Sequence, residues 1–137
     1  MPLLGAWLRR LGTVFIERSE PIGSGGARVK PPLDMAVDSL VVFPEGTFTD
    51  VTGLRPFHLG AFELAAAARV PVIPVAVQGT RTILRDGHVL PRRWPVRITV
   101  GAALERKSTE DTFSAAVRLR DAARDHILRY CGEPDLG

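Results

Sequence analysis

Short apolar runs alternate with helical segments along this chain, and this alternation limits the fold more than any other feature. The runs are rich in β-branched or aromatic residues, which is typical of strands. They are Thr13–Glu17, Ser39–Phe43, Val72–Val77 and Val96–Val100. Strands that alternate with helices predict an α/β fold with a partly parallel central sheet flanked by helices. Pro74 predicts an irregular or edge position within its strand.

Three segments carry apolar residues at helical spacing. In the first, residues 3–11, the stripe either packs on a core or lies on a membrane. It consists of Leu3, Leu4, Trp7, Leu8 and Leu11. The second segment has an apolar face and a proline, Pro56, that suits its first turn. That face comprises Phe57, Ala61, Leu64, Ala65 and Ala68.

The third helix is expected near the end of the chain. Ser108 or Thr109 is predicted to cap its start, and Gly132 suits its end. Its predicted buried face comprises Phe113, Ala116, Val117, Ala123 and Ile127. We expect one domain over residues 1–137, with residues 103–137 as a C-terminal helical extension of it, because 137 residues fit one domain.

Composition and charge exclude several classes of protein. An apolar content of 45% is typical of a globular core rather than of a disordered chain. A formal net charge of +3 favours anionic partners such as phosphate groups or an acidic membrane surface. No Lys/Arg run has interleaved aromatic residues, so no nucleic-acid partner is expected.

The single cysteine, Cys131, cannot form an internal disulfide, which favours a reducing, cytoplasmic compartment. Three scattered histidines and one cysteine show no metal-ligand spacing, so neither a metal site nor a cofactor is expected. No apolar run approaches the roughly 20 residues that a membrane-spanning helix needs.

The run Phe43–Thr49 reads Phe-Pro-Glu-Gly-Thr-Phe-Thr and follows an expected strand. Ligand sites in open α/β sheets lie beyond the carboxyl ends of strands. The ionised Glu45 side chain accepts hydrogen bonds, so it can hold hydroxyl groups or orient a neighbouring base. A structural carboxylate that caps a turn is the alternative. Gly46 allows the backbone to approach a ligand closely.

Arg18 lies at the end of the expected strand Thr13–Glu17. Its planar guanidinium can bind a phosphate through two parallel hydrogen bonds. An ordinary surface ion pair is the alternative interpretation.

Four blocks in order resemble the glycerolipid acyltransferase family, which includes glycerol-3-phosphate and lysophosphatidate acyltransferases. Gly12–Arg18 resembles the family's Gly-x-x-Phe-Ile-x-Arg block, and Phe43–Thr47 resembles its Phe-Pro-Glu-Gly-Thr block. Phe57–Phe62 is similar to Phe-Lys-x-Gly-Ala-Phe, and Val70–Val75 resembles Val-Pro-Val-x-Pro. The resemblance extends over residues 2–102.

The resemblance implies transfer of a fatty acyl group, in phospholipid biosynthesis, to a lysophospholipid or glycerol-phosphate acceptor. The implied donor is acyl-CoA or acyl carrier protein, and the implied location is the inner face of the cell membrane. The acceptor's phosphate and glycerol would be bound by Arg18, Glu45, Gly46 and Thr47. The expected rim of the site comprises Phe15, Phe43, Phe48 and His58.

Two residues depart from the family's pattern. Phe48 stands where many members carry Arg, and His58 stands where Lys is common. A group of arginines could attract the donor's phosphates or anionic lipid, or could form a solvated basic face. They are Arg81, Arg85, Arg92 and Arg93.

The family's general base is the histidine of a His-x-x-x-x-Asp block, whose aspartate orients the imidazole. That block precedes the Gly-x-x-Phe-Ile-x-Arg block, but only 11 residues precede Gly12 here and none is histidine. No aspartate follows five residues after His58, His88 or His126. On a continuous helix His58 and Glu63 would lie about 140° apart. We expect His58 at the site's rim, His88 on the surface of a hairpin turning at Asp86-Gly87, and His126 on the exposed side of the last helix.

The sequence therefore predicts an acyltransferase domain that is incomplete at its N-terminus and inactive alone. Three explanations stay open. The base is encoded upstream of Met1, or the gene is a decayed fragment, or the chain is a non-catalytic lipid-phosphate or membrane-surface binding protein.

Overall fold

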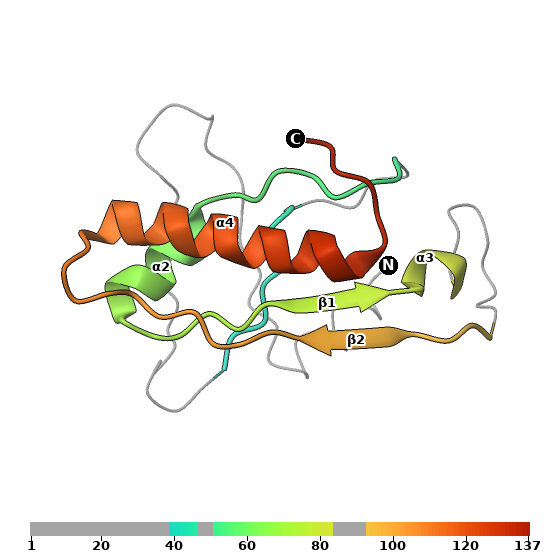
Figure 1. Ribbon diagram of the computed structural model, residues 1–137, viewed down its shortest axis with the longest axis horizontal. Coiled ribbons are helices and arrows are strands. Elements are labelled where there is room, and N and C mark those ends of the chain that lie inside the picture. The colour runs from blue at the N-terminus through green and yellow to red at the C-terminus, as the bar shows by residue number, and fades with distance from the viewer. Residues whose placement is uncertain (1–38, 47–50, 84–92) are drawn as a thin grey trace, which may run out of the picture. The chain divides into compact units, whose positions relative to one another are not determined.

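The computed structural model describes residues 39–46, 51–83 and 93–137. The chain divides into two compact units, Met1–Ser39 and Leu40–Gly137, and the second contains all the described helices and strands. These elements, drawn in Figure 1, are α2 (Gly60–Ala68), β1 (Val75–Gln78), α3 (Thr80–Ile83), β2 (Arg97–Val100) and α4 (Thr112–Cys131). The expected helix over residues 3–11, the expected strand Thr13–Glu17 and the Asp86-Gly87 turn lie outside the described residues.

The sheet of the described residues has two antiparallel strands, β1 and β2. Val75 pairs with Val100 and Gln78 pairs with Arg97, which confirms the strand expected at residues 96–100. Pro74 interrupts the other expected strand as predicted, since β1 begins only after it and its carbonyl accepts a hydrogen bond from the Gly101 amide at 2.8 Å. The partly parallel sheet stays a prediction.

The strand expected at residues 39–43 is not observed. These residues form no strand with any described neighbour, and the side chains of Val41 and Phe43 are 80% and 83% exposed. An apolar run becomes a strand only where another strand supplies partners for its backbone N–H and C=O groups. No strand of the described residues does so here, and the chain turns at Pro44 and Glu45.

Helix α2 begins at Gly60, so the prediction that Pro56 lies in its first turn is wrong. The preceding residues are held differently, because the His58 amide donates to the Pro44 carbonyl at 2.9 Å. The helix buries Phe62, Ala65 and Ala66, and the Phe62 ring stacks on Phe57 with 6.4 Å between the ring centroids.

Helix α4 is capped by Asp111, whose side chain accepts a hydrogen bond from the Ser114 amide at 3.0 Å. The prediction of Ser108 or Thr109 as the cap is therefore wrong. The Arg106 guanidinium fixes this start, because it donates to the Glu110 carbonyl and to the Thr112 hydroxyl. The end of the helix at Gly132, with φ 73°, is as predicted.

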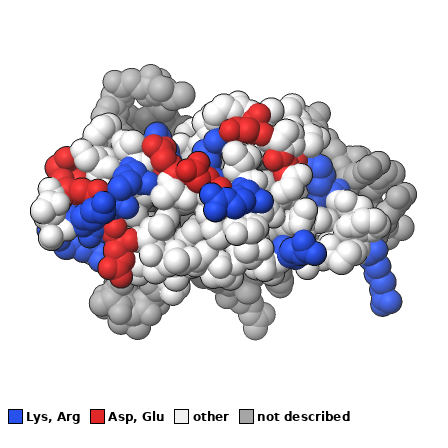
Figure 2. Space-filling view, in the orientation of Figure 1, with Lys and Arg blue, Asp and Glu red and all other residues white. Residues whose placement is uncertain are grey.

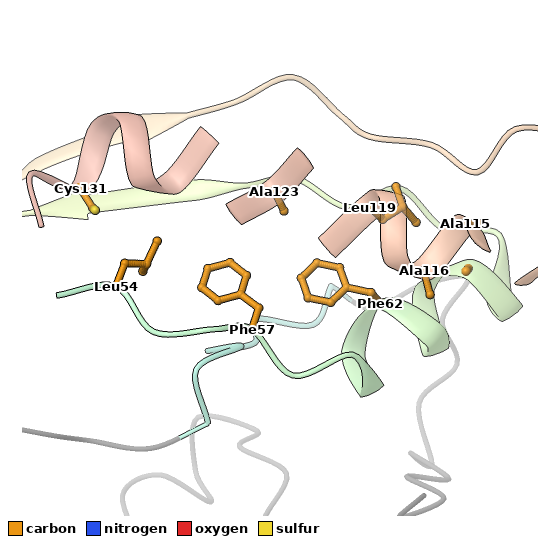
Figure 3. Packing of buried hydrophobic residues seen from close by; sticks show 9 residues of the cluster. Leu54, Phe57, Phe62, Ala115, Ala116, Leu119, Ala123 and Cys131 are labelled. Carbon is orange, nitrogen blue, oxygen red and sulfur yellow. The ribbon is translucent and has the colours of Figure 1, made fainter. Parts of the chain in front are cut away.

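The buried face of α4 consists mostly of alanines. Ala116 and Ala123 were predicted in it, whereas the predicted Phe113 is 63% exposed. Small side chains let α4 approach both α2 and β1, which it contacts (Figure 1). In Figure 3 the rings of Phe57 and Phe62 lie on the side of α4 that carries Ala123 and Leu119, with Phe62 beside the fully buried Leu119. The core cluster comprises Leu54, Phe57, Phe62, Ala66, Ala115, Ala116, Leu119, Ala123 and Cys131.

The two faces of the β1–β2 sheet differ. Ala76 is buried in the face that packs on α4, and the opposite face carries exposed apolar side chains. By their register these are Val75, Val77, Ile98 and Val100. Ala76 shares its face with Gln78, Thr99 and Arg97, so the exposed outer face is the more apolar of the two.

A bidentate ion pair supports the start of α4. Arg118 donates to both carboxylate oxygens of Glu110, at 2.6 and 2.8 Å. These hydrogen bonds, with one from the Lys107 amide, lower the pKa of Glu110 from 4.5 to about 2.

We predict that this pair contributes stability at neutral pH that is lost in acid. A carboxylate with a lowered folded-state pKa stabilises the fold above its unfolded pKa, and protonation removes the effect as the pH falls. The difference in unfolding free energy between the wild type and Glu110→Gln should be constant above about pH 5 and shrink between about pH 4.5 and pH 2. Urea unfolding against pH measures it, with Glu63→Gln, an exposed carboxylate, as control. A difference that does not change with pH would contradict this account.

Candidate functional site

Residues 43–46 form a tight turn, here called the Glu45 turn. The Gly46 amide donates to the Phe43 carbonyl at 3.1 Å, which places Pro44 second and Gly46 fourth in the turn. Proline and glycine favour these positions of a type I turn, and Gly46 adopts φ 70°, a conformation that glycine enters without steric cost. The local sequence therefore specifies this turn.

Two hydrogen bonds tie the Glu45 turn to residues 54–58. The Arg55 amide donates to Glu45 Oε2 at 3.0 Å, and the His58 amide donates to the Pro44 carbonyl at 2.9 Å. The carboxylate of Glu45 thus has the structural role that the sequence left open. No described residue donates a hydrogen bond to its other oxygen, Oε1, so this oxygen can accept one from a ligand.

The structure brings four of the sequence-predicted site residues into one loop region. Phe43 is exposed, Glu45 and Gly46 are half-buried in the turn, and His58 is joined to the turn through its amide. The remaining predicted residues lie outside the described residues, and their roles stay predictions. They are Phe15, Arg18, Thr47 and Phe48.

No sequence motif indicated the residues that hold the 54–58 segment from behind. Arg124 of α4 donates through Nη2 to the Leu54 carbonyl at 3.2 Å and through Nε to the Arg55 carbonyl at 3.4 Å. It also forms an ion pair with Asp135. Arg124 lies beyond the part of the chain that carries the family resemblance, so the resemblance could not point to it.

The described histidines are placed differently from one another. His58 is exposed and precedes α2, so its angle to Glu63 on a continuous helix does not apply. His126 was predicted on the exposed side of α4, but it is half-buried and lies against Gly101, with its ring tilted by 51° to that of Tyr130. Its Nε2 is buried without a hydrogen-bond partner. The prediction failed because Gly101 has no side chain and leaves space for the ring. His88 lies outside the described residues.

The expected group of arginines is only partly described. Arg81 forms an ion pair with Glu133 at 3.1 Å, and Arg93 is exposed. Arg85 and Arg92 lie outside the described residues. On the face shown in Figure 2, basic and acidic side chains are interspersed, so this face is not a continuous basic patch.

Neither a metal cluster nor a membrane-spanning helix occurs in the described part of the chain. It contains no group of three or more histidine, cysteine or acidic side chains that could hold a metal ion. None of its helices is both long enough and apolar enough to cross a membrane.

Comparison with known proteins gives a family and several relatives. The family model described as Acyltransferase matches residues 1–78, which include the Glu45 turn, α2 and β1. The 1-acyl-sn-glycerol-3-phosphate acyltransferase of Saccharomyces cerevisiae is 30% identical over 146 residues, which cover 99% of this chain and 47% of the yeast protein. The Escherichia coli protein of the same name is 38% identical over 82 residues, 58% of this chain and 34% of that protein.

A shorter stretch is more similar still. The 1-acyl-sn-glycerol-3-phosphate acyltransferase of Salmonella typhimurium is 55% identical over 42 residues, 31% of this chain and 17% of that protein. The chain thus spans about half or less of the length of these relatives. No solved structure matches the chain.

We predict opposite effects for alanine at two glycines near the site. Gly46→Ala should lower the free energy of unfolding by about 1–2 kcal/mol, because a Cβ is disfavoured at positive φ. Gly60→Ala should raise it by up to about 1 kcal/mol, because Gly60 begins α2 and a Cβ there meets no atom within 4 Å. Urea denaturation of both variants measures the difference, and a neutral Gly46→Ala would show that the turn needs no glycine.

Proposed function

Because this chain belongs to the glycerolipid acyltransferase family, we propose that it forms the acceptor-binding part of a 1-acylglycerol-3-phosphate acyltransferase of phospholipid biosynthesis. The proposed reaction moves a fatty acyl group from acyl-CoA or acyl carrier protein to a lysophospholipid or glycerol-phosphate acceptor. The names of the relatives support the acceptor. The observation that carries the proposal is the Glu45 turn, fixed by the Arg55 amide with one carboxylate oxygen left to accept a hydrogen bond.

We propose that two residues of opposite charge bind different parts of the acceptor. A carboxylate repels a phosphate but accepts hydrogen bonds from hydroxyl groups, so Glu45 suits the glycerol part of the acceptor. The phosphate requires a cation, and the bidentate guanidinium of Arg18 suits it. In this proposal Gly46 and Thr47 lie beside the glycerol, and the residues of the expected rim surround it.

Acyl transfer needs one proton to move. The acceptor's hydroxyl oxygen forms the new ester bond with the thioester carbonyl, the C–S bond breaks, and the hydroxyl proton is taken by a base while the thiolate is protonated. Neither described histidine forms a hydrogen bond or ion pair with a carboxylate through its ring. Together with the absence of a His-x-x-x-x-Asp block from the sequence, this supports our proposal that the chain binds the acceptor without itself supplying the base.

The proposed location is cytoplasmic, at the inner face of the cell membrane. The exposed side chains of Val41 and Phe43 lie directly before the Glu45 turn and support contact with an apolar surface. A net charge of +3 favours an anionic leaflet. The apolar outer face of β1 and β2 supports a larger, partly parallel sheet covered by helices on both sides.

We predict that Glu45→Gln weakens binding of glycerol 3-phosphate about tenfold, the effect of losing roughly 1.4 kcal/mol. A glutamine oxygen can still accept from the Arg55 amide, so the turn should survive while the hydroxyl loses a charged acceptor. Calorimetric titration measures the affinity. Glu63→Gln makes the same charge change on the exposed face of α2 and should bind as the wild type does. If folded Glu45→Gln and the wild type bind glycerol 3-phosphate with equal affinity, Glu45 does not bind the acceptor's hydroxyl groups.

We predict no turnover above background when the 137-residue chain is given acyl-CoA and lysophosphatidate. The physical reason is the missing base, since the thioester and the acceptor hydroxyl react slowly without proton transfer. Product formation is measured by chromatography, with the Escherichia coli relative as positive control. Product formed at an ordinary enzymatic rate would show that a residue of this chain serves as the base.

The alternative is a non-catalytic protein that binds lipid phosphate or a membrane surface. The exposed side chains of Val41 and Phe43 favour it, because they supply an apolar contact surface that needs no catalytic base. The genomic sequence upstream of Met1 separates the two functions. An in-frame His-x-x-x-x-Asp block there favours the transferase, and a stop codon favours the binding protein.

A further inference from the structure

The guanidinium of Arg124 lies where three parts of the chain meet. Its side chain belongs to α4 and is only 14% exposed. It donates to the carbonyls of Leu54 and Arg55, and it forms an ion pair with Asp135. A guanidinium that loses much of its hydration needs hydrogen-bond partners in exchange, and these two carbonyls and the carboxylate supply them.

The C-terminal segment, residues 133–137, lies along the same stretch of chain (Figure 1). The Leu54 amide donates to the Pro134 carbonyl at 2.8 Å, and the Leu136 amide donates to the Leu54 carbonyl at 3.0 Å. These bonds form a parallel bridge between Leu54 and Asp135. Leu136 packs against Gly53, where a Cβ would collide with its side chain. The backbone at Leu54 is therefore fixed from two directions.

The contacts of Arg124 lead to Glu45 in one further step. The Arg55 carbonyl accepts a hydrogen bond from Arg124 Nε. The amide of the same residue donates a hydrogen bond to Glu45 Oε2 at 3.0 Å. The field of the guanidinium also reaches Glu45. The pKa of Arg124 is raised first by its hydrogen bond to Asp135 and, among smaller causes, by the charge of Glu45. Asp135 in turn has a lowered pKa because Arg124 donates to it.

We propose that Arg124 is a positioning residue for the acceptor site, which sets the place of Glu45 through the backbone of Leu54 and Arg55, with Asp135 orienting its guanidinium. The inference rests on the proposed function of the Glu45 turn. It assigns a role to α4 and the C-terminal segment, both of which lie beyond the region that the family model matches. Arg124 is not proposed to contact the acceptor itself, so its effect on acceptor binding is indirect, through the backbone of residues 54 and 55.

The test compares four variants of the full chain with the wild type. Arg124→Gln removes the charge and the two-pronged donor, whereas Arg124→Lys keeps the charge and loses the fork that reaches two carbonyls. Asp135→Asn keeps the shape of the partner and removes its charge. Arg120→Gln is the matched control, because Arg120 also lies on α4 but pairs with its neighbour Asp121.

Two readouts separate positioning from overall stability. The first is hydrogen exchange of the Arg55 amide relative to amides in the middle of α4, measured by NMR. The second is the affinity for glycerol 3-phosphate. Exchange at Arg55 should become at least tenfold faster in Arg124→Gln, with intermediate values in Arg124→Lys and Asp135→Asn and no change in Arg120→Gln. Affinity should fall in the same order.

A folded Arg124→Gln with an unchanged Arg55 exchange rate would overturn the proposal. Equal acceleration at Arg55 and throughout α4 would also overturn it, because it would indicate loss of global stability alone. If Arg124→Gln does not fold, the milder Asp135→Asn decides in the same way. If the wild type does not bind glycerol 3-phosphate, the proposed function fails, and the exchange at Arg55 still decides whether Arg124 positions Glu45.

Discussion

The half-buried side chain of Arg124 connects parts of the described structure that are distant in sequence. It lies on a helix whose buried face is mainly alanine, and this small face lets α4 approach α2 and β1 closely. The same approach brings Arg124 within reach of the Leu54 and Arg55 carbonyls. The alanine packing therefore sets the position of α4, and α4 in turn holds the backbone that binds Glu45.

The signature Phe43–Thr47 and the residues that hold it in place come from different parts of the chain. The signature supplies the turn itself, since proline and glycine set its geometry and Glu45 provides the carboxylate. Helix α4 and the C-terminal segment hold the backbone at residues 54 and 55, which in turn holds the Glu45 side chain. A carboxylate on an unrestrained loop would lose more conformational entropy on binding a ligand. In the proposed function, less of the site remains to be ordered when the acceptor binds, which favours binding.

Features that depend on neighbouring residues could be predicted from the sequence. The strand at residues 96–100 and the left-handed cap at Gly132 follow from local propensity and were confirmed. The cap of α4 was missed because Ser108, Thr109 and Asp111 are all good caps, and the Arg106 contact to Glu110 selects among them. Residues 39–43 failed as a strand because a strand depends on its partners.

Long-range contacts could not be predicted in the same way. Arg124 and Leu54 are 70 positions apart, and nothing in the local sequence distinguishes this arginine from its exposed neighbours. The resemblance led to Glu45 and Gly46, but it carried no information on what holds them. His126 was misplaced for a related reason, because the space it occupies is created by Gly101 on a distant segment.

The claim at the centre of this account is that Glu45 uses one oxygen for the fold and the other for the acceptor. A crystal structure of the chain with bound glycerol 3-phosphate tests it most directly. We expect a ligand hydroxyl within hydrogen-bond distance of Glu45 Oε1, while Oε2 stays bonded to the Arg55 amide. A ligand bound elsewhere, or a Glu45 side chain turned away from Arg55 to reach it, would contradict the account.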